Sequence, residues 1–171
     1  MKLNDTERRT DDSSWESLRE IVHPVIGQPC WKACLGYADE LRLHLGARVP
    51  YAHAKLAGKF HGEWDFGSRG TTWELVNSFG PVTTSDDSSE TIQRHLRVLE
   101  GTTVTGFDVE RTDLRLTVSF SNGCQLRLIS IPSDDEWEMP YWELFAPNHM
   151  LLTFGPGGVW TYERSNVPTV A

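Results

Sequence analysis

The sequence lacks the short motifs that identify most enzymes. It contains no Gly-x-Ser-x-Gly nucleophile elbow, no Gly-x-x-x-x-Gly-Lys phosphate loop, no Gly-x-Gly-x-x-Gly turn and no His-Glu-x-x-His zinc motif. The Gly-Pro-Gly-Gly stretch at 155–158 is followed by neither a helix pattern nor a lysine, so it predicts a turn and not a phosphate site. The sequence therefore favours a protein that is not an enzyme, and it predicts no catalytic residue and no cofactor.

Long apolar runs and clustered basic residues are also missing. Runs such as 150–152 are far too short to cross a bilayer. The formal net charge is -8, from 24 acidic and 16 basic side chains, whereas nucleic-acid binding depends on grouped Lys and Arg. We expect neither a membrane nor a nucleic acid as partner, because the acidic balance favours solubility or a basic protein partner instead.

Cysteine is scarce, and its spacing is unlike that of a metal site. The three cysteines form an odd set, and no basic segment followed by an apolar run opens the chain, so we expect a reducing cytoplasm. Cys30 and Cys34 are separated by three residues, and no second Cys/His pair has metal-ligand spacing. If 30–34 is a strand, both thiols lie on one face as small buried hydrophobes.

Aromatic residues, by contrast, are abundant. Seven Trp, seven Phe and four Tyr occur among 171 residues, and 39% of the chain is hydrophobic, which is enough to bury the core of one domain. The segment 1–12 is charged and has no apolar stripe, so we expect it to be a mobile tail. We expect 165–171 to be a C-terminal tail.

An internal repeat is the strongest pattern in the sequence. Three matches recur in the same order: Glu40-Leu41-Arg42-Leu43 with Asp113-Leu114-Arg115-Leu116, Trp73-Glu74-Leu75 with Trp142-Glu143-Leu144, and Phe79-Gly80-Pro81 with Phe154-Gly155-Pro156. Each half also opens with a helix pattern that is followed by a glycine, Gly27 or Gly101. These matches predict two degenerate repeats, 13–83 and 84–164, in one globular domain.

Each repeat has the pattern of a helix followed by antiparallel strands. The helices are predicted to begin at capping boxes, Ser13 with Glu16 and Asp87 with Glu90. In the second half, apolar residues alternate along 114–120 and 124–128. A three-residue loop with Gly123 in the left-handed conformation would pair Phe120 with Cys124, Val118 with Leu126 and Leu116 with Leu128.

We therefore predict an α+β fold that is mostly β. Two meanders, each with one helix, would pack as a sandwich or form one continuous curved sheet. Between 46 and 58 the strand pattern lapses in the first half, which indicates an insertion relative to the second half and a natural place for function.

Two groups of residues could form a cleft between the repeats. The densest set of metal-ligating or acid-base side chains comprises His44, His53, His61, Glu63 and Asp65. His44 alternates with its leucine neighbours, however, as a solvent-facing strand residue does. Glu74 and Glu143 follow the repeated tryptophans and would approach each other across a pseudo-twofold axis, where paired carboxylates can divide acid and base roles. Outward-facing strand positions explain these two glutamates more simply.

One loop combines an aromatic residue with four carboxylates. Its members are Asp134, Asp135, Glu136, Trp137 and Glu138. Tryptophan is favoured as an interface anchor, and the surrounding acid would steer a basic partner. This loop is the predicted contact surface, although a tryptophan that folds back into the core would give the same pattern.

The end of the chain resembles a known type of small protein. The Trp-Glu-Leu-Phe run and the Leu-Thr-Phe-Gly-Pro-Gly-Gly-Val-Trp at 152–160 are similar to the end of small uncharacterised bacterial proteins that join a strand-rich body to such a tail. The resemblance implies a fold and no active site. In general type, a small acidic chain without catalytic motifs also resembles the immunity proteins that neutralise bacterial toxins. The sequence thus predicts a protein-binding domain, with a small-molecule-binding or hydrolytic cleft as the alternative.

Overall fold

The computed structural model describes residues 12–129 and 139–165. Within them the chain forms two α-helices and eleven strands, so the predicted α+β, mostly β class is confirmed. The helices are α1 (Asp12–Val22) and α2 (Ser89–Leu96), with 3-10 turns at η1 (His23–Val25), η2 (Tyr37–Asp39), η3 (Ala54–Leu56), η4 (Arg97–Leu99) and η5 (Pro156–Gly158). The strands are β1 (Pro29–Leu35), β2 (Leu41–Pro50), β3 (Phe60–Ser68), β4 (Thr72–Asn77), β5 (Gly80–Thr84), β6 (Thr102–Val109), β7 (Leu116–Phe120), β8 (Gln125–Ile129), β9 (Trp142–Ala146), β10 (Met150–Phe154) and β11 (Trp160–Arg164).

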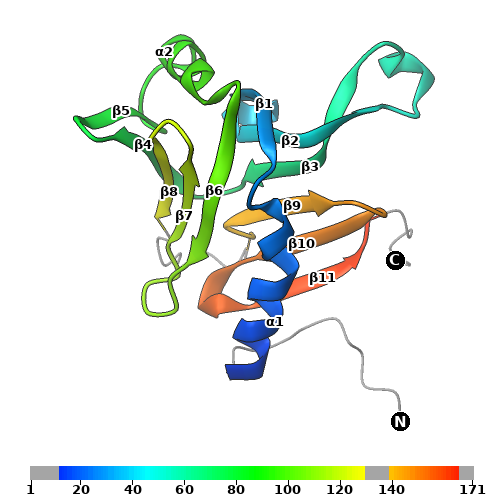
Figure 1. Ribbon diagram of the computed structural model, residues 1–171, viewed down its shortest axis with the longest axis vertical. Helices are drawn as coiled ribbons and strands as arrows, with labels where there is room; N and C mark the ends of the chain where they lie inside the picture. The colour runs from blue at the N-terminus through cyan, green and yellow to red at the C-terminus, as the bar shows by residue number, and fades with distance from the viewer. Residues whose placement is uncertain (1–11, 130–138, 166–171) are drawn as a thin grey trace.

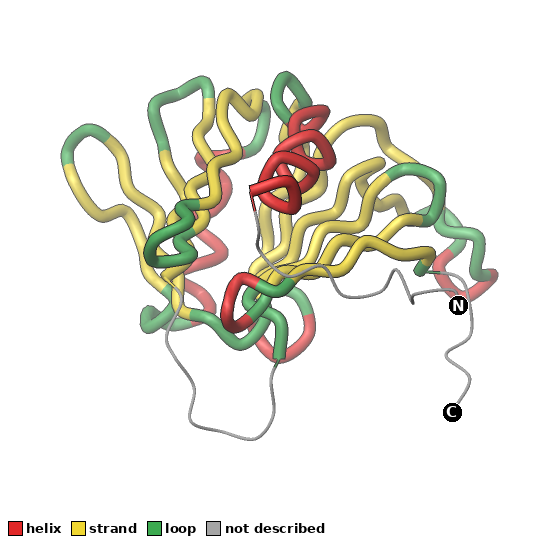
Figure 2. The backbone as a smooth tube through the Cα atoms, turned by 90° about the horizontal axis from the view of Figure 1, so that it is seen from below, coloured by secondary structure: helices red, strands yellow, loops and turns green. Residues whose placement is uncertain are grey.

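All the strands belong to one antiparallel sheet with the order β11-β10-β9-β3-β2-β1-β6-β7-β8-β4-β5 (Figure 1). Of the two predicted packings, the structure therefore has the continuous sheet. Strands β1 and β6 meet through only two paired positions, and the strands on either side form two groups inclined to one another (Figure 2). Phe66, Phe107 and Trp142 bring the two groups together, with ring centroids 5.6–6.1 Å apart in a single hydrophobic core.

Each half completes the sheet of the other half. The meander β1-β2-β3 is extended by β9, β10 and β11, whereas the meander β6-β7-β8 is extended by β4 and β5. The two meanders meet at β1 and β6 through reciprocal backbone hydrogen bonds. Gly27 N–H donates to the carbonyl of Val104, and Gly101 N–H donates to the carbonyl of Cys30, both at 2.8 Å. The same interval in sequence separates the two donors and the two acceptors, so the two bonds occupy corresponding positions in the two halves.

The repeated tryptophans occupy equivalent positions. Trp73 on β4 lies opposite Leu128 on β8, and Trp142 on β9 lies opposite Ser68 on β3, at the same place in each meander. Both indoles are buried. In each repeat the glutamate that follows the tryptophan therefore points to the opposite face of its strand.

Two of the sequence matches fail in detail. Phe79 lies fully exposed in the turn between β4 and β5, whereas Phe154 is fully buried at the end of β10. Leu41 lies opposite Leu35 at the end of β1, and Leu116 lies opposite Val109 at the end of β6. The structural equivalent of Leu41 is therefore Leu116 and not Leu114. Short motifs such as Leu-Arg-Leu recur within one repeat, and the strand register decides which copies correspond.

The predicted hairpin register in the second half is confirmed. Leu116 lies opposite Leu128, Val118 lies opposite Leu126, and Gly123 has a φ of 85°. The predicted start of the second helix is wrong by one residue: Ser88 caps α2, with its side chain accepting from the N–H of Thr91. Asp87 instead accepts hydrogen bonds from Thr83 and Thr84 in the turn that precedes the helix.

The prediction that Cys30 and Cys34 lie on one face is wrong, although Cys30 is buried as predicted. The register of β1 shifts between Cys30 and Lys32, which inserts one extra residue and reverses the facing of the rest of the strand. Cys30 is thus buried on the core side, while Cys34 lies opposite Arg42 on the other face. Burial raises the pKa of Cys30 to about 12 and also raises the pKa of Cys34, so neither thiol is activated as a nucleophile.

Gly27 and Gly101, which donate two hydrogen bonds between the halves, allow a matched test of whether their positions are equivalent. Gly27 and Gly101 have φ angles of 94° and 84°, and an added Cβ would meet no atom within 4 Å at either site. Gly27→Ala and Gly101→Ala should each lower the free energy of unfolding by a similar amount, about 1–2 kcal/mol, through backbone strain alone. Urea denaturation measures the effect. Gly70→Ala, at a position without positive φ, is the control and should change little.

Candidate functional site

A charged cluster lies on the face of β2, β3 and β9 that is turned away from the core. The core face of β2 carries Leu41, Leu43 and Leu45, all fully buried, so the intervening Arg42 and His44 point to the opposite face. Strand pairing places Asp65 across from His44, and it places Glu143 across from Gly67, the partner of Arg42. Alternation along three neighbouring strands thus gathers these side chains.

Arg42 is the centre of this cluster. Its guanidinium lies 2.8 Å from Asp65 Oδ2 and 3.1 Å from Glu143 Oε1, and both carboxylate residues are only 8% exposed. Burial alone would lower the pKa of Arg42, but the charges and hydrogen bonds of Asp65 and Glu143 outweigh burial and raise it. Gly67 makes the geometry possible, because a Cβ there would lie 2.7 Å from Arg42 Nη1.

A second arginine extends the network. Arg69 Nη1 lies 3.6 Å from Glu143 Oε1 and 3.7 Å from Glu40 Oε2. Two arginines thus face three carboxylates, and the charges are nearly balanced within the cluster.

His44 is buried beside this cluster, which corrects the prediction that it faces solvent. It is 6% exposed, its ring centroid lies 5.2 Å from that of Trp31, and burial lowers its pKa. Its Nδ1 accepts a hydrogen bond of 3.0 Å from Gly62 N–H. The neutral ring therefore carries its hydrogen on Nε2, and the remaining lone pair is already used. His44 is placed as a structural acceptor and not as a general base.

The histidines do not converge. The Nδ1 atom of His53 accepts from Lys55 N–H at the exposed start of η3, whereas the His61 ring packs against Tyr51 at a tilt of 52°, with ring centroids 4.9 Å apart. Glu63 bonds to the backbone of Ala47. Within residues 12–129 and 139–165, no group of three His, Cys, Asp or Glu side chains could hold a metal ion.

The two repeated glutamates lie in separate parts of the sheet. Glu74 on β4 pairs with Arg127 at 3.6 Å, and Glu143 pairs with Arg42 and Arg69. Strands β3, β2, β1, β6, β7 and β8 lie between β9 and β4 in the sheet order. Each glutamate is neutralised by arginines of its own neighbourhood, so the two do not form an acid-base pair.

The fold does not itself require the charged cluster. Through the equivalence of Leu41 with Leu116, the positions of Arg42 and His44 correspond to Thr117 and Ser119 on β7. The counterpart of Asp65 is the residue that pairs with Ser119, which is Gln125. The second repeat thus has small or uncharged polar residues at these three places, as an ordinary solvated sheet face does.

A two-stranded ribbon projects from the sheet beside this cluster. Strand β1 pairs with β2 only as far as Leu45, and β9 pairs with β3 only from Asp65 onward. The outer ends of β2 and β3, residues 48–50 and 60–62, pair with each other and with no other described strand. With the η3 turn they form the ribbon 46–62, which extends away from the other strands (Figure 1). The predicted insertion is this ribbon.

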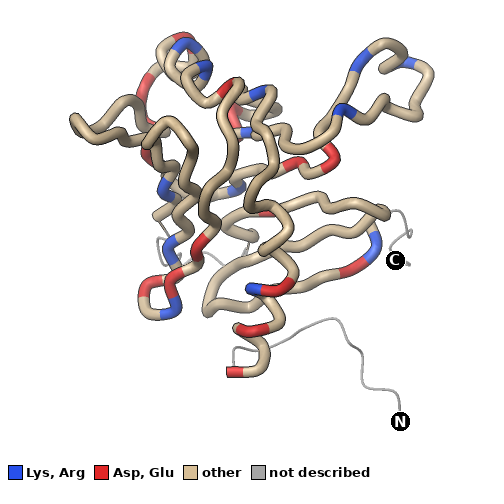
Figure 3. Tube along the Cα trace, viewed as in Figure 1, with Lys and Arg blue, Asp and Glu red and all other residues tan. Residues whose placement is uncertain are grey.

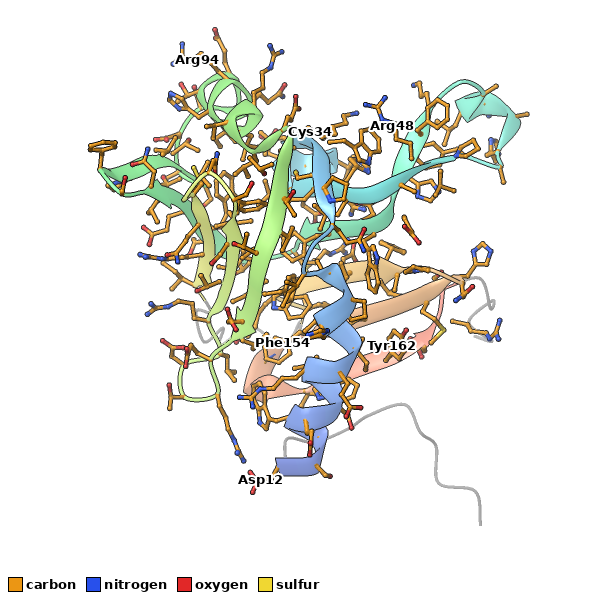
Figure 4. The ribbon with its side chains drawn as sticks, in the orientation of Figure 1. Asp12, Cys34, Arg48, Arg94, Phe154 and Tyr162 are labelled. Carbon is orange, nitrogen blue, oxygen red and sulfur yellow. The ribbon has the colours of Figure 1, made fainter. Side chains whose placement is uncertain are left out.

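Aromatic contacts hold the ribbon at its base. The Arg48 guanidinium lies 4.7 Å from the centre of the Trp31 ring, at the place where the ribbon leaves the sheet (Figure 4). The Tyr51 ring contacts that of His61 across the two strands, and Tyr51 N–H donates to the carbonyl of Lys59 at 3.1 Å. Isolated two-stranded ribbons are only marginally stable, so these contacts supply order that neighbouring strands do not.

The ribbon has its own charge and exposed aromatic surface. Residues 46–62 include Arg48, Lys55 and Lys59 and no carboxylate, in a chain whose formal charge is -8 (Figure 3). Phe60 and Tyr51 are 44% and 37% exposed. The sequence pattern predicted an insertion and a place for function here, but it did not predict a two-stranded ribbon, because the ribbon is defined by where β1 and β9 stop pairing with β2 and β3.

The predicted acidic contact loop, Asp134 to Glu138, lies outside the described residues. No described helix is long and apolar enough to cross a membrane. Comparison of the chain with protein-family models, with curated proteins and with solved structures finds no match.

Removing the central arginine tests the charged cluster. Arg42→Met leaves Asp65 and Glu143 buried without their shared cation, which should cost about 3–5 kcal/mol of stability near neutral pH. The loss should be smaller in acid, where bound protons can neutralise the two carboxylates. Arg127→Met removes a less buried arginine, which pairs with Glu74, and it should cost about 1 kcal/mol or less. Urea unfolding measures the free energy of unfolding of both variants. Equal losses in the two variants would contradict the role of Arg42 in neutralising Asp65 and Glu143.

His44 should make stability depend on pH. Because burial lowers its pKa from 6.5, the unfolded chain takes up a proton more readily than the folded chain. The stability that comes from neutral His44 is therefore fully present above pH 6.5 and is lost as the pH falls below that value. His44→Gln keeps an acceptor for Gly62 N–H and should flatten the stability profile in that range. A profile with the same slope as the wild type would contradict this origin.

Proposed function

We propose that the chain is a non-enzymatic protein-binding domain of bacterial type, with an immunity-like role, and that the ribbon 46–62 is its contact element. The observation that carries the proposal is an ordered, exposed ribbon that has no neighbouring strand and no carboxylate. The three cysteines of the chain are free, which fits a reducing compartment. We therefore include a cytoplasmic location in the proposal.

The ribbon has two properties that favour recognition. No other described strand pairs with its outer edges at 48–50 and 60–62, so an added strand could pair there. Its order in the free chain, supported by the contacts of Arg48 and Tyr51, reduces the entropy that binding must remove.

The surface chemistry of the ribbon selects the kind of partner. Lys55 and Lys59 lie on the ribbon with the exposed Phe60. Aromatic side chains dominate binding energy when a partner covers them, and surrounding charges speed association with a surface of opposite sign. We therefore propose an acidic partner surface with an apolar recess for Phe60. The acidic loop Asp134 to Glu138 remains a second predicted surface, suited to a basic partner.

The alternative, a hydrolytic cleft built from the histidines and the repeated glutamates, has less support. His44 uses its Nδ1 lone pair on Gly62, and Glu74 and Glu143 are each neutralised by nearby arginine. A general base needs a free lone pair within reach of a substrate proton.

Capture experiments with the immobilised chain test the ribbon. Phe60→Ala, and Lys55→Glu with Lys59→Glu, should each reduce capture of a specific partner from a bacterial lysate at low salt by about tenfold or more. The charge variant should also remove the salt dependence of capture.

Matched controls come from elsewhere on the chain. Phe79→Ala removes another exposed phenylalanine from a hairpin turn, and Arg94→Glu with Arg97→Glu reverses two exposed charges on and after α2. These variants should capture the partner like the wild type. If reversal of Asp134, Asp135 and Glu136 abolishes capture while the ribbon variants do not, the acidic loop is the contact surface and the ribbon is not.

A further inference from the structure

The ribbon 46–62 joins the sheet where the ladder between β2 and β3 is interrupted. The register shifts between Leu45 and Arg48, where two residues of β2 lie opposite one residue of β3. This is a β-bulge, in which Gly46 has a φ of 77°. A bulge disrupts the regular ladder bonds, so the ribbon root, residues 45–48 and 62–64, depends on other contacts.

Two side chains supply hydrogen-bond acceptors at the ribbon root. Gly62 N–H donates to Nδ1 of His44 at 3.0 Å, and Ala47 N–H donates to Oε2 of Glu63 at 3.4 Å. The first bond is shorter and buried, whereas the second is exposed. Because hydrogen bonds are stronger away from water, His44 is the stronger of these two anchors.

A second histidine binds Gly62 in the opposite sense. The carbonyl oxygen of Gly62 lies 2.8 Å from Nδ1 of His61. A carbonyl oxygen can only accept, so His61 carries a hydrogen on Nδ1, whereas Nδ1 of His44 must be free of hydrogen to accept from Gly62 N–H. A proton added to His61 therefore leaves its bond to Gly62 intact. A proton added to His44 removes the lone pair that holds Gly62 N–H.

Asp65 is placed to receive the protonated ring of His44. Its Oδ2 lies 3.9 Å from His44 Nδ1, which is too far for a hydrogen bond but close enough for attraction between opposite charges. Its Oδ1 is buried and has no hydrogen-bond partner among the described residues. A protonated His44 can thus donate to Asp65, and Gly62 N–H is then left without its acceptor.

The surroundings of His44 determine when it takes up a proton. The charged and titratable groups that face it are Lys32 on β1, Arg42 on β2, and Asp65 and His61 on β3. Arg48 lies over the Trp31 ring that packs beside it. Burial is the largest effect and lowers the pKa of His44 from 6.5; the three basic groups lower it further, and Asp65 opposes them. The bond to Gly62 is therefore complete at neutral pH and is lost as the pH falls below 6.5.

We propose that His44 is a pH-dependent switch at the ribbon root. While its ring is neutral, His44 holds Gly62 N–H and fixes the ribbon against the sheet. When the ring is protonated it turns to Asp65, the bond to Gly62 is lost, and the ribbon moves more freely about the bulge. Regulation of partner binding by this switch rests on the proposed role of the ribbon, whereas the switch itself is a property of the free chain.

Proton–nitrogen NMR of the uniformly labelled free chain tests the switch. The His44 ring is titrated from about pH 8 to about pH 5, and the amide signal of Gly62 is followed in the same samples. We expect both to change with one midpoint, which lies below pH 6.5. Protection of the Gly62 amide from hydrogen exchange, relative to an unstructured chain at each pH, should fall roughly three- to tenfold over this range.

Two substitutions of His44 fix the two states. His44→Asn places an amide oxygen where Nδ1 lies, so the Gly62 amide should keep its protection down to about pH 5. His44→Phe keeps a ring against Trp31 but has no acceptor, so the Gly62 amide should be roughly three- to tenfold less protected already at neutral pH. His61→Asn keeps a donor for the Gly62 carbonyl and is the matched control, in which the response of Gly62 N–H to pH should be unchanged. Circular dichroism checks the fold of each variant.

Three results would overturn the switch. One is a Gly62 amide that does not respond while the His44 ring titrates. Another is a His44 ring that stays neutral until the chain unfolds in acid. The third is the same Gly62 response in His44→Asn as in the wild type, which would assign the response to another group.

Partner capture separates the switch from the proposed function. If the ribbon is the contact element, the wild type should capture its partner less well at about pH 5 than at about pH 8, whereas His44→Asn should lose less. Equal losses in both would overturn the regulation of binding. Failure of Phe60→Ala to reduce capture would contradict the ribbon as contact element and leave the NMR response of the free chain unaffected.

Discussion

The architecture depends on the junction of β1 with β6, where backbone hydrogen bonds run in both directions between the two halves. Gly27 N–H donates to the carbonyl of Val104, Gly101 N–H donates to the carbonyl of Cys30, and Val104 N–H donates to the carbonyl of Gln28. So few paired positions join the two strands that the sheet changes direction there. This change of direction lets the core faces of both strand groups cover the same aromatic cluster, which one flat sheet could not do. The junction thus determines both the continuity of the sheet and the shape of the core.

The two halves have similar buried residues but different residues on the face turned away from the core. Strand pairing makes Trp73 and Trp142 equivalent, because the interior of both halves must be filled in the same way. Away from the core this constraint is absent. The first half has Arg42, His44, Asp65 and a long ribbon, whereas Thr117, Ser119 and Gln125 occupy the positions of the second half that match these three residues. The positions where the halves differ are therefore the places where specific function is most reasonably sought.

Local patterns predicted the local structure well. The alternation of 116–128 and the turn at Gly123 determined the hairpin register, and the repeated Trp-Glu-Leu identified equivalent strands. The failures involve long-range effects. The extra residue in β1 after Cys30 reverses the facing of Cys34, and His44 is buried because Trp31 lies against it. The contact of Trp15 with Phe154 depends on where α1 packs in space, and no spacing in the sequence predicts that contact.

The exchange of strands between the halves has a consequence for synthesis. Strand β3 receives its outer neighbour, β9, only after nearly the whole chain has been made. Until then a nascent first half presents an open sheet edge, together with the apolar surface that Trp142 and Leu144 later cover. Such an edge invites pairing with another chain. The native sheet on this side can therefore form only after β9 has been made.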